Sequence, residues 1–141
     1  MPNEPVLVDT GALAALFDPN DQYHDVCKEA AKQLPVGKAF TCWPVITEAA
    51  YLLRRYPDKR DSLLESVEAG EFQLVSLHGS DLPALREIFA KYHDQQIDLA
   101  DAALLFLADR EGLEDVFTVD RRHFSLFRKQ NGKSLHLIPN A

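Results

Sequence analysis

The sequence predicts an α/β fold, a three-layer α/β/α sandwich with a mainly parallel central sheet. Short apolar runs alternate along the chain with stretches of helical character, which is the pattern of that fold class. Most of these runs are continuous rather than interrupted by polar residues, as expected of strands buried on both faces of a parallel sheet. The chain of 141 residues contains no repeat, linker or low-complexity segment, so residues 1–141 are expected to form a single domain.

Five strands are expected, each a short run of mostly apolar residues. In chain order they are Val6–Val8, Ala39–Cys42, Phe72–Val75, Val116–Val119 and Leu135–Ile138. Cys27 and Cys42 are too few and too irregularly placed for a disulfide framework or a metal knuckle. Both are therefore expected to be buried thiols.

Helices with recognisable end signals lie between the strands. The first three expected helices cover residues 21–34, 44–56 and 58–69. Asp21 is a possible N-cap for the first, and Pro44 suits the first turn of the second. Gly70 is placed to end the third.

Two further helices are expected in the second half of the chain. Leu82–Tyr92 carries apolar side chains at helical spacing, and Ser80 and Asp81 can cap it. Asp98–Arg110 is apolar almost all round and is therefore expected to lie deep in the core, ending before Gly112.

Acidic residues gather where the expected strands end. Asp9 follows the first strand and Asp120 follows the fourth. Glu48 lies in the helix after the second strand, and Asp101 lies in the first turn of the buried helix. Ligand clefts of parallel sheets lie beyond the carboxyl ends of the strands, so these acids are expected to meet there.

Each acid taken alone has an ordinary structural explanation. Asp9 either caps the next helix or holds a cation. Asp98 as the N-cap and Asp101 in the first turn can both interact favourably with the positive end of the helix dipole. Glu48 has only apolar helical neighbours, which favours a directed position over a side chain at the rim of the core. Asp120 by itself is typical of a turn.

A cluster of these acids requires protons or a divalent cation. Two carboxylates about 4 Å apart repel by roughly 4 kcal/mol at an effective dielectric constant near 20. Oxygen ligands without a histidine pair favour Mg²⁺ or Mn²⁺ over zinc. The net charge is −7, and Asp9, Glu48, Asp98, Asp101 and Asp120 account for five of these negative charges. The acidic balance is thus compatible with a nucleic acid, whose phosphates Arg121 and Arg122 can contact, although a solvated basic loop explains these arginines equally well.

Four segments of the chain resemble the acidic motifs of PIN domains, in their usual order. They read VLVDTGALAALFD, PVITEAAYLL, DLADAALLFLA and VFTVDRRHF. The resemblance covers nearly the whole chain and is closest to VapC-type toxins of toxin–antitoxin pairs. It implies a PIN-like fold and metal-dependent endoribonuclease activity, with one or two Mg²⁺ or Mn²⁺ ions held by the carboxylates.

The resemblance also implies roles for individual residues. Asp9, Glu48, Asp101 and Asp120 would be the catalytic, metal-coordinating acids. Thr10, Asp98 and Thr118 would support the site, and Arg121 and Arg122 would bind substrate. Many members carry asparagine two residues after the first aspartate, and Gly11 at that position removes a possible hydrogen bond.

The family's partners are expected as well: an RNA substrate, a small antitoxin and a second copy of the chain in a homodimer. Trp43, Tyr51 and Phe127 are candidates for such protein contacts, although core packing is the favoured interpretation for each. The apolar runs are far shorter than the roughly 20 residues that span a membrane, and the N-terminal MPNEP lacks a basic start. A cytoplasmic location is therefore expected.

Two alternatives stay open. The Asp-Thr-Gly of residues 9–11 also occurs in aspartic proteases, but these are all-β proteins and only a homodimer would supply the second aspartate. The stronger alternative is a PIN-like module that binds RNA or protein without cutting. The intact set of four acids favours the nuclease.

Overall fold

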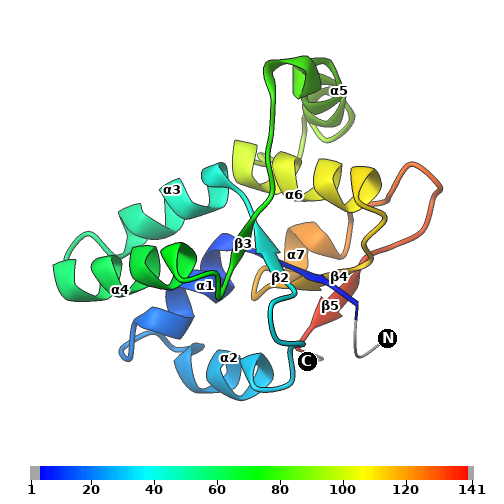
Figure 1. Ribbon diagram of the computed structural model, residues 1–141. Coiled ribbons are helices and arrows are strands. Elements are labelled where there is room, and N and C mark those ends of the chain that lie inside the picture. Colours follow the sequence, from blue (N-terminus) through cyan, green and yellow to red (C-terminus); the bar gives the residue numbers. More distant parts are fainter. Residues whose placement is uncertain (1–3, 140–141) are drawn as a thin grey trace.

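The fold is a parallel sheet covered by helices on both sides (Figure 1). The structure is a computed structural model that describes residues 4–139. Five strands within this range pair in the order β3-β2-β1-β4-β5, and every pair is parallel. They are β1 (Val6–Val8), β2 (Ala39–Thr41), β3 (Gln73–Leu74), β4 (Asp115–Phe117) and β5 (His136–Ile138). The predicted three-layer α/β/α fold is confirmed, with each strand within two residues of its expected bounds.

The five expected helices are present, although some of their ends differ from the expected ones. They are α1 (Thr10–Phe17), α2 (His24–Ala31), α3 (Trp43–Leu52), α4 (Pro57–Glu68), the 3-10 turn η1 (Gly79–Asp81), α5 (Leu82–Lys91), α6 (Leu99–Arg110) and the short α7 (Arg121–Phe124). Helix α6 packs near the sheet, and α5 lies beyond it on the side away from the strands (Figure 1). Gly70 and Gly112 follow α4 and α6 with φ of 84° and 68°, the left-handed conformation that ends a helix.

Three expected helix ends were wrong because local hydrogen bonds compete with the helix. Asp21 does not cap a helix from residue 21: its Oδ1 accepts from the backbone N–H of Tyr23 at 2.8 Å, and α2 begins only at His24. Asp81 likewise closes η1 by accepting from the N–H of His78 at 2.8 Å, and does not cap α5. Helix α3 stops at Leu52, short of residue 56.

The core includes residues of the sheet and of the helices around it, α6 among them. As its composition predicts, α6 is buried on nearly all sides, and it includes Leu104 and Leu107 without exposed surface. Cys27 and Cys42 are buried free thiols, as expected. Among the bulky apolar candidates Phe127 is in the core, but Trp43 and Tyr51 are 64% and 61% exposed, so the core interpretation was wrong for both.

Gly11 lies at a close approach between α1 and the chain that follows β4. A Cβ at residue 11 would lie 2.9 Å from Cγ2 of Val119, closer than side chains tolerate. Val119 therefore fills the space that an asparagine at this position would need. Close packing against Val119 thus explains why glycine, rather than the asparagine common in the family, stands at position 11.

Gly11→Ala is expected to lower the free energy of unfolding by about 1–3 kcal/mol, because β-branched Val119 cannot rotate away freely. Val119→Ala in the same chain should recover most of that loss. Chemical denaturation of the single and double variants measures the coupling. Gly79→Ala is the control, since a Cβ there meets nothing within 4 Å. Equal losses in the single and double variants would contradict the explanation.

None of the helices within residues 4–139 is both long and apolar enough to cross a membrane.

Candidate active site

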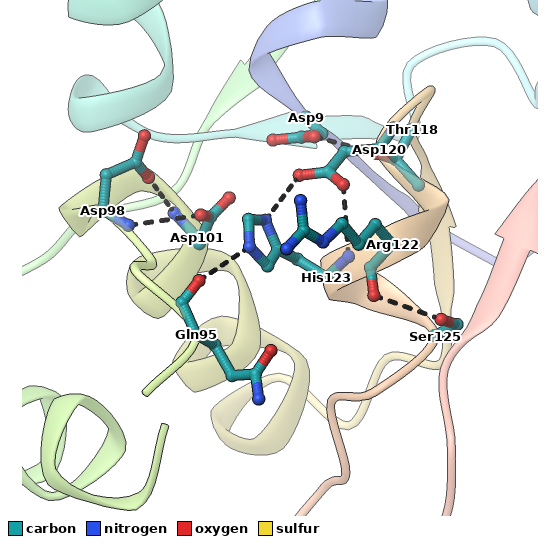
Figure 2. A network of polar contacts seen from close by, with 9 residues as sticks. All are labelled: Asp9, Gln95, Asp98, Asp101, Thr118, Asp120, Arg122, His123 and Ser125. Carbon is teal, nitrogen blue, oxygen red and sulfur yellow. Dashed lines mark hydrogen bonds and ion pairs between the residues drawn. The ribbon is translucent and has the colours of Figure 1, made fainter. Parts of the chain in front are cut away.

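The site forms where the direction of strand addition reverses. The chain adds β2 and β3 on one side of β1 and then returns to add β4 and β5 on the other. A crevice opens beyond the carboxyl ends of the strands at such a point. The N–H of Asp9 donates to the carbonyl of Phe117 at 2.9 Å and so joins the ends of β1 and β4. The residues that follow both strands, Asp9 and Thr118 to Asp120, therefore meet (Figure 2).

Asp9 is buried without serving as a cap. It occupies the N-cap position of α1, yet its side chain makes no capping hydrogen bond. Its Oδ2 accepts instead from the hydroxyl of Thr118 at 2.8 Å, and that hydroxyl accepts from the N–H of Asp120 at 2.9 Å. Burial raises the pKa of Asp9 to about 6, although the Thr118 hydrogen bond partly offsets this rise. Of the two explanations for a carboxylate here, the capping one lacks the hydrogen bond that it requires.

Asp98 and Asp101 form a reciprocal cap at the start of α6. Oδ1 of Asp98 accepts from the N–H of Asp101 at 2.9 Å, and Oδ2 of Asp101 accepts from the N–H of Asp98 at 3.2 Å. Asp101 is 8% exposed. Burial and the negative charge of Asp98 raise the pKa of Asp101 to about 7. The capping interpretation of this pair is confirmed. These backbone hydrogen bonds do not, however, supply a positive charge to offset the negative charge of Asp101.

Four of the predicted acids lie close enough to oppose one another's ionisation. After burial, the charges of Asp120 and Asp98 contribute to the raised pKa of Asp9. The charges of Asp9 and Asp120 likewise raise the pKa of Asp101. Figure 2 shows the two pairs, Asp9 with Asp120 and Asp98 with Asp101, on either side of the His123 ring. These four acids thus share one negative region.

His123 connects the two halves of this region. Its Nδ1 lies 2.9 Å from Oδ2 of Asp120, and its Nε2 lies 2.8 Å from the carbonyl oxygen of Gln95. Both neighbours offer oxygen acceptors, and only a protonated imidazole ring can donate from both of its nitrogens. Burial opposes this charge, but the hydrogen bond and negative charge of Asp120 outweigh it and raise the pKa of His123.

The sequence analysis assigned no role to His123. A usable signal was its position three residues after Asp120, the spacing at which a helix N-cap accepts from a backbone N–H. Oδ1 of Asp120 does accept from the N–H of His123, at 3.1 Å. The contact with Gln95 had no sequence signal, because the two residues are 28 positions apart.

Glu48 lies at the edge of the site rather than in it. It is exposed on α3 and lines a cavity of about 310 Å³ together with Leu99 and Ala100 at the start of α6. Its charge does not contribute to the raised pKa values of Asp9 and Asp101. Within residues 4–139, no three acidic, histidine or cysteine side chains converge closely enough to surround a metal ion.

The predicted supporting and substrate-binding residues have different surroundings. Thr118 bridges Asp9 and Asp120 as described. Thr10 has a buried Oγ1 with no hydrogen-bond partner in the part of the chain that is described.

Arg121 donates from Nη1 to the carbonyl of Pro139 at 2.7 Å. The guanidinium of Arg122 makes no hydrogen bond or ion pair within residues 4–139 and is drawn extending from α7 across the Asp120–His123 pair in Figure 2.

Comparison with known proteins bears on this arrangement. A model of the PIN domain matches residues 6–130, most of the chain. The chain belongs to the PIN domain family. Ribonuclease VapC26 of Mycobacterium tuberculosis is 32% identical over 136 residues, which cover 95% of this chain and all of that protein. The chain is therefore a VapC-like PIN domain, as its four motifs predict.

Solved structures share the fold of this PIN domain. The Mycobacterium tuberculosis toxin VapC20, described as cleaving the sarcin-ricin loop, matches with a TM-score of 0.75 and 18% identity over 83% of this chain and 91% of that one. A toxin–antitoxin complex from Klebsiella pneumoniae matches with a TM-score of 0.67 and 18% identity over 86% and 92% of the two chains.

Proposed function

We propose that this VapC-like PIN domain is a metal-dependent endoribonuclease and the toxin of a toxin–antitoxin pair. One observation carries the proposal: Asp9 ends a buried strand, caps nothing, and shares a negative region with Asp101 and Asp120. The 32% identity to Ribonuclease VapC26 supports the reaction class.

The donor set fits Mg²⁺ or Mn²⁺. Its candidate ligands, Asp9, Asp101, Asp120 and the more distant Glu48, all offer carboxylate oxygens, which hard divalent cations prefer. Mg²⁺ commonly keeps several of its waters, so a site that the protein surrounds only in part suits it. The unpartnered Oγ1 of Thr10, beside Asp9, is a further polar atom that a hydrated ion would satisfy.

The proposed mechanism assigns each residue a task that its contacts support. When bound, a divalent ion supplies Lewis-acid polarisation of the scissile phosphate and lowers the pKa of a coordinated water. Asp9 and Asp101 provide fixed negative charge in a buried setting, and Thr118 orients Asp9. His123 holds Asp120 in place. Arg121 and Arg122 contact the RNA backbone, with Arg122 the more available of the two.

The proposal extends to location and partners. A small antitoxin is supported by the similarity to the chain from the Klebsiella pneumoniae toxin–antitoxin complex. A homodimer and a cytoplasmic location remain part of the proposal as the resemblance implies. Exposed Trp43 and Tyr51 on α3 offer apolar surface for a protein contact.

RNA cleavage by the purified chain tests the proposal. We expect cleavage of cellular RNA with Mg²⁺ or Mn²⁺, none with chelator, and recovery when metal is restored. Asp101→Asn should reduce the rate by about 100-fold or more, because the carboxylate that the metal requires is lost. Asp61→Asn, at an exposed position on α4, is the matched control. RNA binding without cleavage in every metal condition would instead favour the non-cutting PIN module.

A further inference from the structure

A cavity lies next to Asp120. Its volume is about 510 Å³, within the range of small-molecule sites. One wall is Tyr23 and Val26 at the start of α2, and the other is Val119 and Pro139. Asp120 is among the residues that line it, so the cavity adjoins the candidate active site.

The first wall presents an aromatic face to solvent. Tyr23 is 40% exposed and Val26 is 45% exposed, which leaves two apolar side chains in water beside the cavity. The Tyr23 ring makes no contact with another aromatic ring within residues 4–139. Cys27, one helical turn after Tyr23, is fully buried and anchors the helix. The exposed part of Tyr23 is therefore accessible to an incoming planar group.

Two hydrogen bonds hold the walls of the cavity in place. Nδ1 of His24 donates to the carbonyl of Ala15 at 2.7 Å and holds the start of α2 against α1. Arg121 donates to the carbonyl of Pro139 at 2.7 Å and holds the segment after β5 against α7. The cavity is thus formed in advance, which reduces the ordering cost of binding.

Charge at the rim favours a phosphate-linked ligand. Arg122 lines the cavity, is exposed, and has no protein partner for its guanidinium in the described chain. In a nucleotide, one ribose separates the base from its phosphate. A phosphate held beside Asp120 and Arg122 would therefore present its base to the apolar wall formed by Tyr23 and Val26.

We propose that this cavity is a nucleobase subsite, in which the base of a nucleotide next to the scissile phosphate stacks on Tyr23 while Arg122 holds the adjoining phosphate. The inference rests on the proposed function, since it is Asp120 that connects cavity and cleavage site. Single-stranded RNA is the ligand, because only unpaired bases can enter such a pocket and stack on an aromatic side chain.

Binding measured with chelator present tests the subsite without cleavage. The two probes are a short oligouridylate and the matching abasic ribose-phosphate oligomer, followed by fluorescence anisotropy. Tyr23→Ala should weaken binding of the oligouridylate about 10-fold and leave binding of the abasic oligomer unchanged. Tyr23→Phe should keep the wild-type affinity, because it keeps the ring. Tyr56→Ala, at a tyrosine of matched exposure (39%) between α3 and α4, should change neither.

Arg122→Gln should weaken both oligomers and reduce the dependence of binding on salt, since it removes a phosphate contact. Equal loss with both probes in Tyr23→Ala, or no loss with either, would overturn the subsite; in the second case a protein segment becomes the better occupant of the cavity. Cleavage by the wild type is measured separately. If the wild type cuts RNA but Tyr23→Ala does not selectively weaken binding of the oligouridylate, the proposed function stands and only the subsite is overturned.

Discussion

Asp9→Asn is expected to abolish RNA cleavage and at the same time to stabilise the metal-free protein. The buried carboxylate, whose pKa is raised to about 6, is costly to ionise in the folded state. At pH 8, where Asp9 is ionised in both states, the neutral asparagine should raise the free energy of unfolding by about 2 kcal/mol. Its side-chain oxygen can still accept from Thr118. Cleavage should fall by about 100-fold or more, because a ligand of the metal is lost.

The same shift fixes the pH dependence of stability. The folded protein binds the Asp9 proton more tightly than the unfolded chain, whose value is 3.8. The stability of the metal-free wild type should therefore fall as pH rises from about 4 through about 6, and then level off. Asp101, with its pKa raised to about 7, extends the fall slightly higher. In Asp9→Asn the free energy of unfolding should decrease less over the same pH range than it does in the wild type.

Added Mn²⁺ provides the complementary measurement. It should raise the midpoint of thermal unfolding of the wild type more at pH 8 than at pH 5, because protons compete for the carboxylates at the lower pH. Asp9→Asn should lose most of this gain, whereas the surface control Asp61→Asn should behave as the wild type. A metal-free Asp9→Asn protein that is less stable than the wild type at pH 8 would show that the carboxylate is stabilised by its surroundings.

His123→Ala is expected to reduce both cleavage and Mn²⁺ affinity by about 10- to 100-fold, the usual cost of losing a group that orients a ligand. The variant frees Oδ2 of Asp120 and leaves the carbonyl of Gln95 without its donor. His123→Gln should lose less cleavage and less Mn²⁺ affinity than His123→Ala, because its amide group can still donate to one of the two acceptors, Asp120 or the carbonyl of Gln95.

Two measurements separate positioning from a general loss of structure. The apparent Kd for Mn²⁺ should change, and the far-ultraviolet circular dichroism should not. His93→Ala is the matched control, since that histidine is exposed and its ring, among the described residues, hydrogen-bonds only to the carbonyl of Ala90 in the preceding turn. Unchanged Mn²⁺ affinity with reduced cleavage would mean that His123 acts on the substrate instead.

The site was predictable as far as its chemistry follows from local pattern. Buried strands ending in Asp9 and Asp120 and the reciprocal cap of Asp98 and Asp101 all follow from residue types over a few positions. Whether Asp9 would cap α1 could not be predicted, because an N-cap aspartate can point toward its own helix or away from it. The position of Thr118, just after β4, decided that choice.

Glu48 marks the opposite case. Its apolar helical neighbours predict a directed position, and it does face the start of α6. Its distance from the other acids, however, depends on how α3 and α6 cross, and no pattern within either helix fixes that. It is accordingly the candidate ligand with the weakest structural connection to the site.

The sequence by itself determined the α/β class, the parallel strands, the buried α6 and the four acidic motifs, since each depends on periodicity or spacing along one segment. Only the tertiary structure decided which side chains touch. Thr118 and Asp9 are 109 residues apart and meet because β4 lies beside β1. The His123–Gln95 bridge and the cavity between Tyr23 and Pro139 have the same origin. Contacts of this kind depend on strand order and helix packing, which are properties of the whole chain rather than of any segment.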